Sequence, residues 1–401
     1  MTEKTLRITA WSALGAVTLA MVAATFVERF HGSDAALEYI YHNPLFFLFW
    51  AVLLIAGGAL LLFQRLQKRP FTFGIHLSFA IILAGALVTH IFSREGEMTI
   101  REGETAAVIS QKDGTALSLP FELRLNKFTV VADPVSGSPA DFRSDVTVID
   151  GGETEYAISM NHILKWRQWR FYQADYDLEQ STSTLYASRD PWGNAITYAG
   201  YMLLLVSLTG FFFEKKSGFR RAFGESEGWA KAIMLAIVLI ACAATFFVIR
   251  GYILKQSSLP PVLRTYLLPV HVGSMVISYT ILGGAALTSL AGIVICKDPV
   301  REKLGNISLA VLYPGIFFLT FGIFIGAVWA NVSWGGYWGW DPKETWALIT
   351  LMVYSLTLHG SSLKIFRKPL FFHIYTVAAL LSVLVTWLGV SYFLGGMHAY
   401  M

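Results

Sequence analysis

A dense group of tryptophans occupies residues 329–346, which read WANVSWGGYWGWDPKETW. Tryptophan and tyrosine are common where a membrane meets water. That role does not account for five tryptophans interleaved with glycines and followed by a charged turn. Glycine lets a backbone approach a ligand closely, and aromatic rings offer flat apolar faces. The segment therefore predicts a surface for a large, flat, apolar ligand. The residues that we expect to form this surface are Trp334, Gly335, Trp338, Gly339, Trp340 and Asp341.

Four histidines are expected at two matched depths in the apolar part of the chain. His76 lies about two helical turns after a basic loop, and His359 lies little more than one turn before another. Both are therefore expected near the inner membrane face. His271 begins an apolar run and His398 follows the last one, so both are expected near the outer face, level with the tryptophans. Because ionisable residues inside a membrane are costly and usually functional, we interpret these histidines as two ligand pairs.

Other histidines compete with this assignment. His90 lies fourteen residues after His76, which is about 21 Å along a helix, so it is expected at the outer face. His373 is an alternative to His359 but ranks lower because it lies nearer the water. The histidines expected to be solvated are His31, His42 and His162.

The pairing of neutral imidazoles beside stacked rings limits the metal chemistry. Tetrahedral zinc requires more nitrogen, sulfur or carboxylate ligands than such a pair supplies. Cys242 and Cys296 stand singly in apolar runs, so we expect small core residues rather than a redox or metal site. Haem needs one or two axial ligands, an apolar slot and cations for its propionates, and it fits better. Candidate propionate partners are Arg250, Lys255, Arg264 and Lys343.

Membrane spans are the elements that must position these residues. The chain has 401 residues, of which 55% are hydrophobic and 14% charged, and its apolar runs reach the roughly 20 residues needed to cross a bilayer. The net charge of +4 is modest and follows from basic loops, so it gives no reason to expect nucleic-acid binding. About nine spans are predicted, at residues 8–27, 44–63, 71–92, 192–213, 229–248, 268–296, 307–329, 345–363 and 370–394.

The basic residues predict the orientation of these spans. Lysines and arginines collect in alternate loops, around residues 65–69, 215–221, 297–303 and 364–368. Such loops are typically cytoplasmic, so the N-terminus is expected on the cytoplasmic side of the membrane and the C-terminus on the outer side. The first apolar run has the length of a retained helix rather than of a cleaved signal.

The insert at residues 93–191 is the only sizeable polar part of the chain. Four runs alternate apolar and polar residues, at 106–111, 121–131, 145–150 and 155–160, and turn signals separate them. We predict a β-rich domain, either a sandwich or a partial barrel, with residues 166–170 as one of its strands. The fold class is thus a polytopic α-helical membrane protein with one extracytoplasmic β-rich domain after the third span.

Longer motifs resemble a known family. The run WGGYWGWDPKETWALIT, followed by YSLTLH, resembles the tryptophan-rich signature of haem-handling proteins of cytochrome c biogenesis, the CcsA/ResC branch in particular. The runs FGIHLSFAIILAGALVTH, MNHILKWRQWRFYQADYD and RDPWGNAITYAG are similar to the CcsB/ResB partner. The chain therefore resembles a fused CcsB–CcsA protein of System II. Leu351 stands where the family often has a tryptophan.

This resemblance implies an activity and roles for individual residues. It implies that haem b is carried across the membrane and attached to the CxxCH motif of apocytochrome c through thioether bonds, the activity of a cytochrome c synthase of the haem lyase type. His76 and His359 would bind haem within the membrane, and His271 and His398 would bind it outside. No acid–base group is expected to be dedicated to the addition; the histidines and the tryptophan segment would position the haem.

The same resemblance implies partners and a division of the chain. Expected partners are apocytochrome c, a periplasmic thioredoxin-like thiol reductant and membrane lipid. The predicted division is residues 1–92 as CcsB-like helices, 93–191 as the periplasmic domain, 192–228 as a span and cytoplasmic linker, and 229–401 as the CcsA-like part. Two other functions stay open: a haem exporter or chaperone that serves a separate lyase, and a redox carrier between haems near the two faces.

Overall fold

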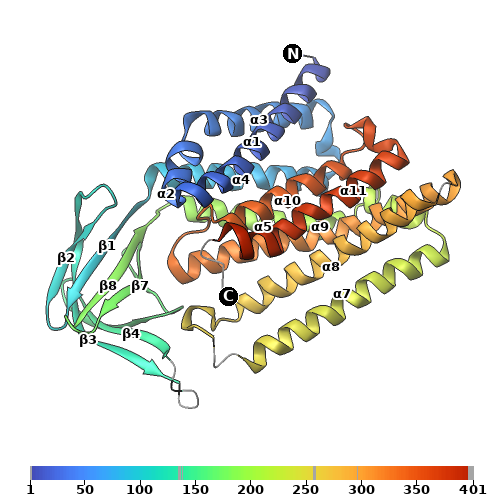
Figure 1. Ribbon diagram of the computed structural model, residues 1–401. Coiled ribbons are helices and arrows are strands. Elements are labelled where there is room, and N and C mark those ends of the chain that lie inside the picture. The colour runs from blue at the N-terminus through green and yellow to red at the C-terminus, as the bar shows by residue number, and fades with distance from the viewer. Residues whose placement is uncertain (1, 134–136, 138, 256–258, 296, 396–401) are drawn as a thin grey trace.

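A computed structural model describes residues 2–133, 137, 139–255, 259–295 and 297–395, in which long helices run side by side and a β-sheet covers one end of them (Figure 1). We call that end of the helices the sheet end and the opposite one the far end. The sheet is inserted between α4 (Pro70–Phe92) and α5 (Gly193–Phe211), as the predicted insert requires.

Eight of the described helices are long and apolar enough to cross a membrane. They are α1 Glu3–His31, α3 Pro44–Phe63, α4 Pro70–Phe92, α5 Gly193–Phe211, α7 Gly228–Leu254, α8 Leu267–Val294, α9 Asp298–Trp334 and the helix Pro369–Leu394, which is divided into α11 Pro369–Leu384 and the π-helix η6 Val385–Leu394. The remaining predicted span, at residues 345–363, corresponds to α10 (Pro342–Leu358), which has 17 residues. The apolar helical architecture is therefore confirmed, and the crossing by α10 stays a prediction.

Short helices and turns join the long ones. They are α2 Ser33–Ala36, η1 Leu37–Tyr41, η2 Leu66–Lys68, α6 Gly218–Gly224, η4 Pro261–Leu263 and η5 Lys364–Arg367. The start of α9 lies nine residues before the predicted one, because Pro299 occupies its first turn and the helix runs through the polar sequence that precedes its apolar part. A search for uncharged runs does not detect a helix start that contains charged residues.

The eight described strands form one antiparallel sheet in the order β5-β4-β3-β2-β1-β8-β7-β6. Their bounds are β1 Arg94–Arg101, β2 Thr105–Ser110, β3 Ala116–Ala132, β4 Pro139–Ile149, β5 Glu153–Ser159, β6 Leu164–Trp166, β7 Trp169–Asp177 and β8 Thr182–Arg189. Strands β2 to β5 match the four alternating runs predicted from the sequence. The single sheet excludes a two-sheet sandwich for the described residues.

The sheet curls so that distant strands meet. Ser144 of β4 donates a hydrogen bond to the Oε1 atom of Gln173 in β7 (2.6 Å), and its hydroxyl lies 2.8 Å from that of Ser183 in β8. A bridge between Ser159 and His162 links the ends of β5 and β6. This arrangement agrees with the partial-barrel alternative.

Residues 166–170 differ from their prediction. They form a tight hairpin between β6 and β7 instead of one strand, because Arg167 and Gln168 have positive φ values of 44° and 69°. Two successive residues with positive φ are typical of the two-residue turns that match the twist of a hairpin. Trp166 and Trp169 are thereby paired across the turn.

Close packing fixes α4 against α5. A Cβ atom at Gly74 would lie 2.2 Å from the Ser207 hydroxyl oxygen, and one at Gly85 would lie 2.3 Å from that of Thr197. Small residues let membrane helices approach each other in this way. The contact sets the position of α4, which carries His76 and His90.

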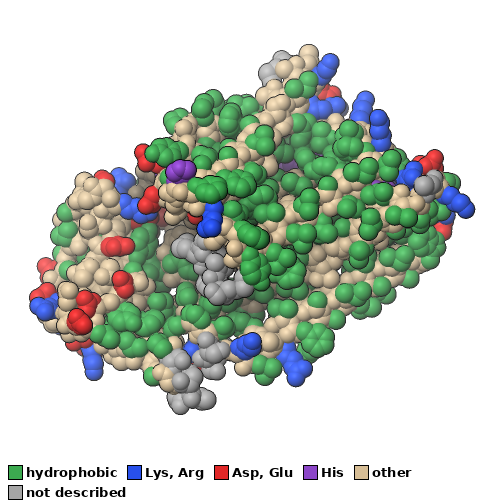
Figure 2. All heavy atoms as spheres, viewed as in Figure 1, with side chains coloured by type: hydrophobic (Ala, Val, Ile, Leu, Met, Phe, Trp, Pro, Cys, Tyr) green, Lys and Arg blue, Asp and Glu red, His purple; other side chains and the backbone are tan. Residues whose placement is uncertain are grey.

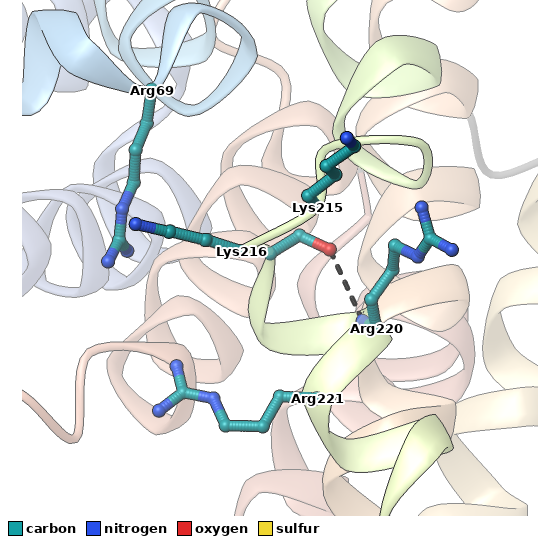
Figure 3. Close-up of a pocket in the computed structure, with 6 residues that line it drawn as sticks. Arg69, Lys215, Lys216, Arg220 and Arg221 are labelled. Atoms are coloured by element: carbon teal, nitrogen blue, oxygen red, sulfur yellow. Dashed lines mark hydrogen bonds between the residues drawn. The ribbon is translucent and has the colours of Figure 1, made fainter.

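Basic side chains gather at the far end (Figure 2). A depression there, of about 660 Å³, is lined by Arg69, Lys215, Lys216, Ser217, Arg220 and Arg221. Figure 3 shows Arg69, at the start of α4, and Lys216, in the loop after α5, with the charged ends of their side chains directed toward each other. The basic loops therefore share one end of the helices, as the alternation along the sequence predicted.

One cysteine prediction is wrong. Cys242 is exposed on α7, and a small apolar side chain on an outward face of a membrane helix loses nothing by this, since lipid is as apolar as the core. Cys296 lies outside the described residues.

Candidate functional site

His76 and His359 face each other at the far end. Their ring centroids are 5.9 Å apart and the ring planes are perpendicular, at 90°. His76 belongs to α4, and His359 caps the C-terminus of α10. The sequence indicated that His76 and His359 lie at similar depths, and in the structure their rings are in contact. Trp11 of α1 adds a third ring, edge-on to His359 at 5.3 Å.

Backbone carbonyls fix the tautomer of both rings. The Nδ1–H group of His76 donates to the carbonyl oxygen of Thr72 (2.8 Å), and that of His359 donates to the carbonyl oxygen of Ser355 (2.7 Å). A carbonyl can only accept, so Nδ1 carries the proton and Nε2 has the lone pair. This is the arrangement found where a histidine binds a metal through Nε2.

His373, the alternative partner, is used differently. Its ring is fully buried, and Nε2 lies 3.0 Å from the carbonyl oxygen of Arg301, to which it can only donate. A Cβ atom at Gly292 would lie 2.4 Å from the same nitrogen. The ring therefore joins α11 to α8 and α9, and its Nε2 is occupied by that contact.

Of the outer pair of histidines, only His271 lies among the described residues. His271, in α8, donates from Nδ1 to the carbonyl oxygen of Gly322 in α9 (2.7 Å), which again makes Nε2 the unprotonated nitrogen. A Cβ atom at Gly326 would lie 2.7 Å from Nδ1, so glycine is needed beside the ring. His398 lies outside the described residues.

The tryptophan segment turns between two helices. α9 ends at Trp334, and Gly335 adopts φ of 90°, the left-handed conformation that glycine tolerates at a helix end. Asp341, which is buried, caps α10: its Oδ1 atom accepts a hydrogen bond from the Lys343 backbone N–H (2.8 Å). Asp341 thus has a structural role in shaping the turn. Gly339 donates its N–H group to Glu344 Oε2 (2.9 Å).

The tryptophan rings are shared between two packing clusters. Trp338 packs with the α8–α9–α10 core, whereas Trp340 and Trp346 pack with α1 and α3. Trp340 stacks on Tyr41 at 4.2 Å. One face of Trp340 is therefore covered by protein, and the segment also connects the first helices to the last ones, which the sequence did not indicate.

Two indole groups of the segment lack acceptors. The Nε1–H groups of Trp329 and Trp338 are buried and have no hydrogen-bond partner among the described residues. Since buried donors are nearly always satisfied, each such donor is suited to an acceptor on a bound molecule, such as a carboxylate.

The β-sheet holds the segment directly. Tyr172 donates to the backbone oxygen of Asn331 (3.1 Å), and Arg170 donates to its side-chain oxygen (3.0 Å). Ser333 donates to Asn161 (2.8 Å). A Cβ atom at Gly335 would lie 2.9 Å from the Tyr172 ring. These residues were not singled out from the sequence, although the run of rings and cations at 166–170 contains Arg170.

The candidate propionate partners have different surroundings. Arg264 lies 3.5 Å from Asp133 and donates to the carbonyl oxygen of Leu259 (2.9 Å). Lys343 belongs to the tryptophan segment itself and donates to the Ser391 hydroxyl (3.1 Å). Arg250 and Lys255 lie at the end of α7. Lys343 is the one of these four cations that the segment contains.

Comparison with known families now defines the class of protein. Residues 192–398 match the family described as Cytochrome C assembly protein, and residues 68–197 match the ResB-like family. The chain belongs to the cytochrome c assembly family and is a fused CcsB–CcsA protein of System II.

Individual relatives support this assignment. The chain is 37% identical over 156 residues to protein NrfI of Wolinella succinogenes, covering 36% of this chain and 17% of that protein. It is 38% identical over 160 residues to the cytochrome c biogenesis protein CcsA of Chlamydomonas reinhardtii, covering 36% and 44%. It is 32% identical over 203 residues to CcsA of Prochlorococcus marinus (strain MIT 9312), covering 42% and 65%. The matches thus span less than two thirds of each of these relatives.

Proposed function

We propose that this protein carries haem b from the far end to the sheet end of its helices and attaches it to the CxxCH motif of an apocytochrome c. The observation that carries the proposal is the His76–His359 pair, whose Nδ1 atoms are both tied to backbone carbonyls. Membership of the cytochrome c assembly family supports it.

The spacing of this pair suits the iron of a haem. A metal–imidazole bond is about 2 Å long, so two rings on opposite sides of one metal have centres roughly 6 Å apart; the observed separation is 5.9 Å. No cluster of three or more His, Cys, Asp or Glu ligands occurs in the described part of the chain. Two imidazoles alone suit iron that already has four porphyrin nitrogens better than they suit a bare ion.

We assign the second haem position to the sheet end. Its proposed residues are His271, His398, Trp334, Gly335, Trp338, Gly339, Trp340 and Asp341. The Nδ1–H contact of His271 and the unpaired indole donor of Trp338 support this assignment. Asp341 acts there by capping α10 and so fixing the turn that carries the rings.

The chemistry at the sheet end is an addition. Each cysteine S–H adds across a haem vinyl group, so that one C–S and one C–H bond form, the S–H bond and the vinyl π-bond are lost, and no oxidant is consumed. The protein contributes by holding haem and peptide together, which removes most of the entropic cost of their encounter. A thioredoxin-like reductant would keep both thiols reduced, and surrounding lipid would complete the binding surface.

The proposed orientation puts the far end in the cytoplasm and the sheet in the periplasm of a bacterial inner membrane. The basic loops at the far end support this, because cytoplasmic loops carry an excess of lysine and arginine. We keep the division into residues 1–92, 93–191, 192–228 and 229–401 as part of the proposal.

A complementation experiment separates synthesis from haem export. The full chain is expressed in a host without other cytochrome c maturation genes, together with a CxxCH reporter, and covalent haem is measured after denaturing electrophoresis. We expect the wild-type chain to produce covalent cytochrome c and the His359→Ala variant to lose this activity. The control variant His31→Ala, which changes an exposed histidine at the end of α1, should keep it. Free haem export without covalent product would contradict the synthase and favour the exporter; neither product would contradict both.

A further inference from the structure

A second pair of histidines meets at the sheet end of α4. His42, which follows η1, and His90, in the last turn of α4, have ring centroids 6.1 Å apart with planes inclined at 41°. Both side chains are exposed. The sequence predicted an outer position for His90 and a solvated His42, but it did not indicate that the two would meet.

The helix register relates this pair to the first one. Residues fourteen positions apart on an α-helix lie about 21 Å apart along the axis and point about 40° apart around it. Hence α4 directs His76 towards His359 at the far end, and His90 towards His42 at the sheet end, from nearly the same face. The two pairs have almost equal centroid separations, 5.9 Å and 6.1 Å.

Both imidazoles are available as ligands. No side-chain hydrogen bond or ion pair of either ring occurs among the described residues. Imidazole binds metals through the lone pair of its neutral form.

One aromatic ring contacts the pair directly, and a second residue links it to the tryptophan segment. The Phe47 ring lies 5.6 Å from that of His90, and its side chain is 40% exposed. Tyr41, the residue before His42, stacks on Trp340 of the tryptophan segment. The pair thus has an apolar neighbour in Phe47, and His42 is adjacent in sequence to a residue that contacts the proposed sheet-end haem site.

We propose that His42 and His90 form an additional bis-histidine haem-binding site, a transfer position between the His76–His359 pair and the tryptophan segment. The inference rests on the proposed function, because it takes haem as the transported ligand. The described residues offer no third protein ligand here, and a bare zinc ion would require one, whereas haem iron does not. Phe47 supplies an apolar face for the porphyrin.

Haem titration of a purified variant tests this site separately. The four proposed ligands of the other two sites are replaced by alanine (His76, His359, His271 and His398), and ferrous haem is titrated into the full chain in detergent. We expect a six-coordinate, low-spin spectrum to persist. Adding His42→Ala or His90→Ala should then weaken haem binding by about tenfold or more, since even indirect partners of metal ligands change affinity by 10–100-fold, and free imidazole should restore the spectrum.

Matched controls keep the outcomes distinct. His31→Ala in the same background should change nothing, and thermal unfolding should be unaffected by His42→Ala because the side chain is exposed. If the background variant binds no low-spin haem although the wild type does, the inference is wrong and the proposed function stands. If the wild type and the background variant bind haem equally, and His42→Ala has no effect in either, the His42–His90 site and the proposed function are both wrong. Competition by Zn²⁺ without haem binding would show a metal-ion site only and overturn the inference.

Discussion

Tyr41 stacks on Trp340 with ring centroids 4.2 Å apart and planes within 16° of parallel. The tyrosine belongs to η1, between the first two long helices, and the tryptophan belongs to the turn before α10. Trp340 also has a positive φ of 58°, an uncommon conformation for a bulky residue. The contact therefore holds a strained backbone turn and ties the segment between α1 and α3 to the tryptophan segment.

Removal of the Tyr41–Trp340 stack should weaken the packing between the first helices and the tryptophan segment. Tyr41→Ala deletes a fully buried ring, and substitutions of this kind cost about 3–5 kcal/mol in soluble cores. We expect a lower unfolding temperature in detergent and faster haem loss. Tyr41→Phe keeps the ring and removes only the 3.3 Å contact of the hydroxyl with Thr345, so it should behave almost as the wild type. Equal stability of the alanine and phenylalanine variants would contradict the role of the stack.

Two adjacent glycines provide a second comparison. At Gly335, φ is 90° and an added Cβ atom would meet the Tyr172 ring at 2.9 Å. Gly335→Ala should therefore strain the turn by about 1–2 kcal/mol, and move the sheet away from the tryptophan segment. At Gly336 an added Cβ atom meets nothing within 4 Å. Limited proteolysis of the sheet should accelerate only for Gly335→Ala, and equal rates for both variants would refute the close-contact argument.

Arg170 of β7 should help the sheet to hold the tryptophan segment in place. Its guanidinium group donates to Asn331, and hydrogen bonds that involve a charged group contribute about 1.5–3 kcal/mol. Arg170→Ala should reduce cytochrome c yield while leaving the His76–His359 pair able to bind haem. Arg143→Ala, which removes an exposed pair with Asp145 on β4, is the control and should give normal yield. A normal yield with Arg170→Ala would limit the sheet to a passive covering.

The unpaired indole donors predict a contact with haem. Trp338→Phe keeps an aromatic ring but removes the buried Nε1–H group, which has no acceptor among the described residues. If a haem carboxylate accepts from it, the substitution should raise the rate of haem loss from the sheet-end site without lowering the unfolding temperature. A stabilised protein with unchanged haem retention would show instead that the donor is merely an unsatisfied group of the core.

Several of these features could be predicted from the sequence, and the reason is geometric. Helices are straight rods with a fixed rise per residue, so counting residues from the basic loops gave the depths of His76 and His359, which the structure brings together. The alternation of apolar and polar residues likewise gave β2 to β5. Such patterns depend only on local periodicity.

Lateral contacts could not be predicted in this way. The Tyr41–Trp340 stack and the His42–His90 pair depend on which helices are neighbours, and hydropathy carries no information about that. The same limit applies to Gly335, whose close contact is made by Tyr172 of the sheet. The exposure of Cys242 was missed because lipid-facing and core-facing apolar residues look alike in a sequence.

The absorption spectrum of the purified full chain, in wild type and His359→Ala forms, tests most directly whether the His76–His359 pair binds haem. The wild type should contain b-type haem with the low-spin signature of two histidine ligands. The His359→Ala form should lose the portion of that signal belonging to the far-end pair and regain it with added imidazole, while His31→Ala stays unchanged. Identical haem content and identical spectra in wild type and His359→Ala, with no response to imidazole, would contradict the account.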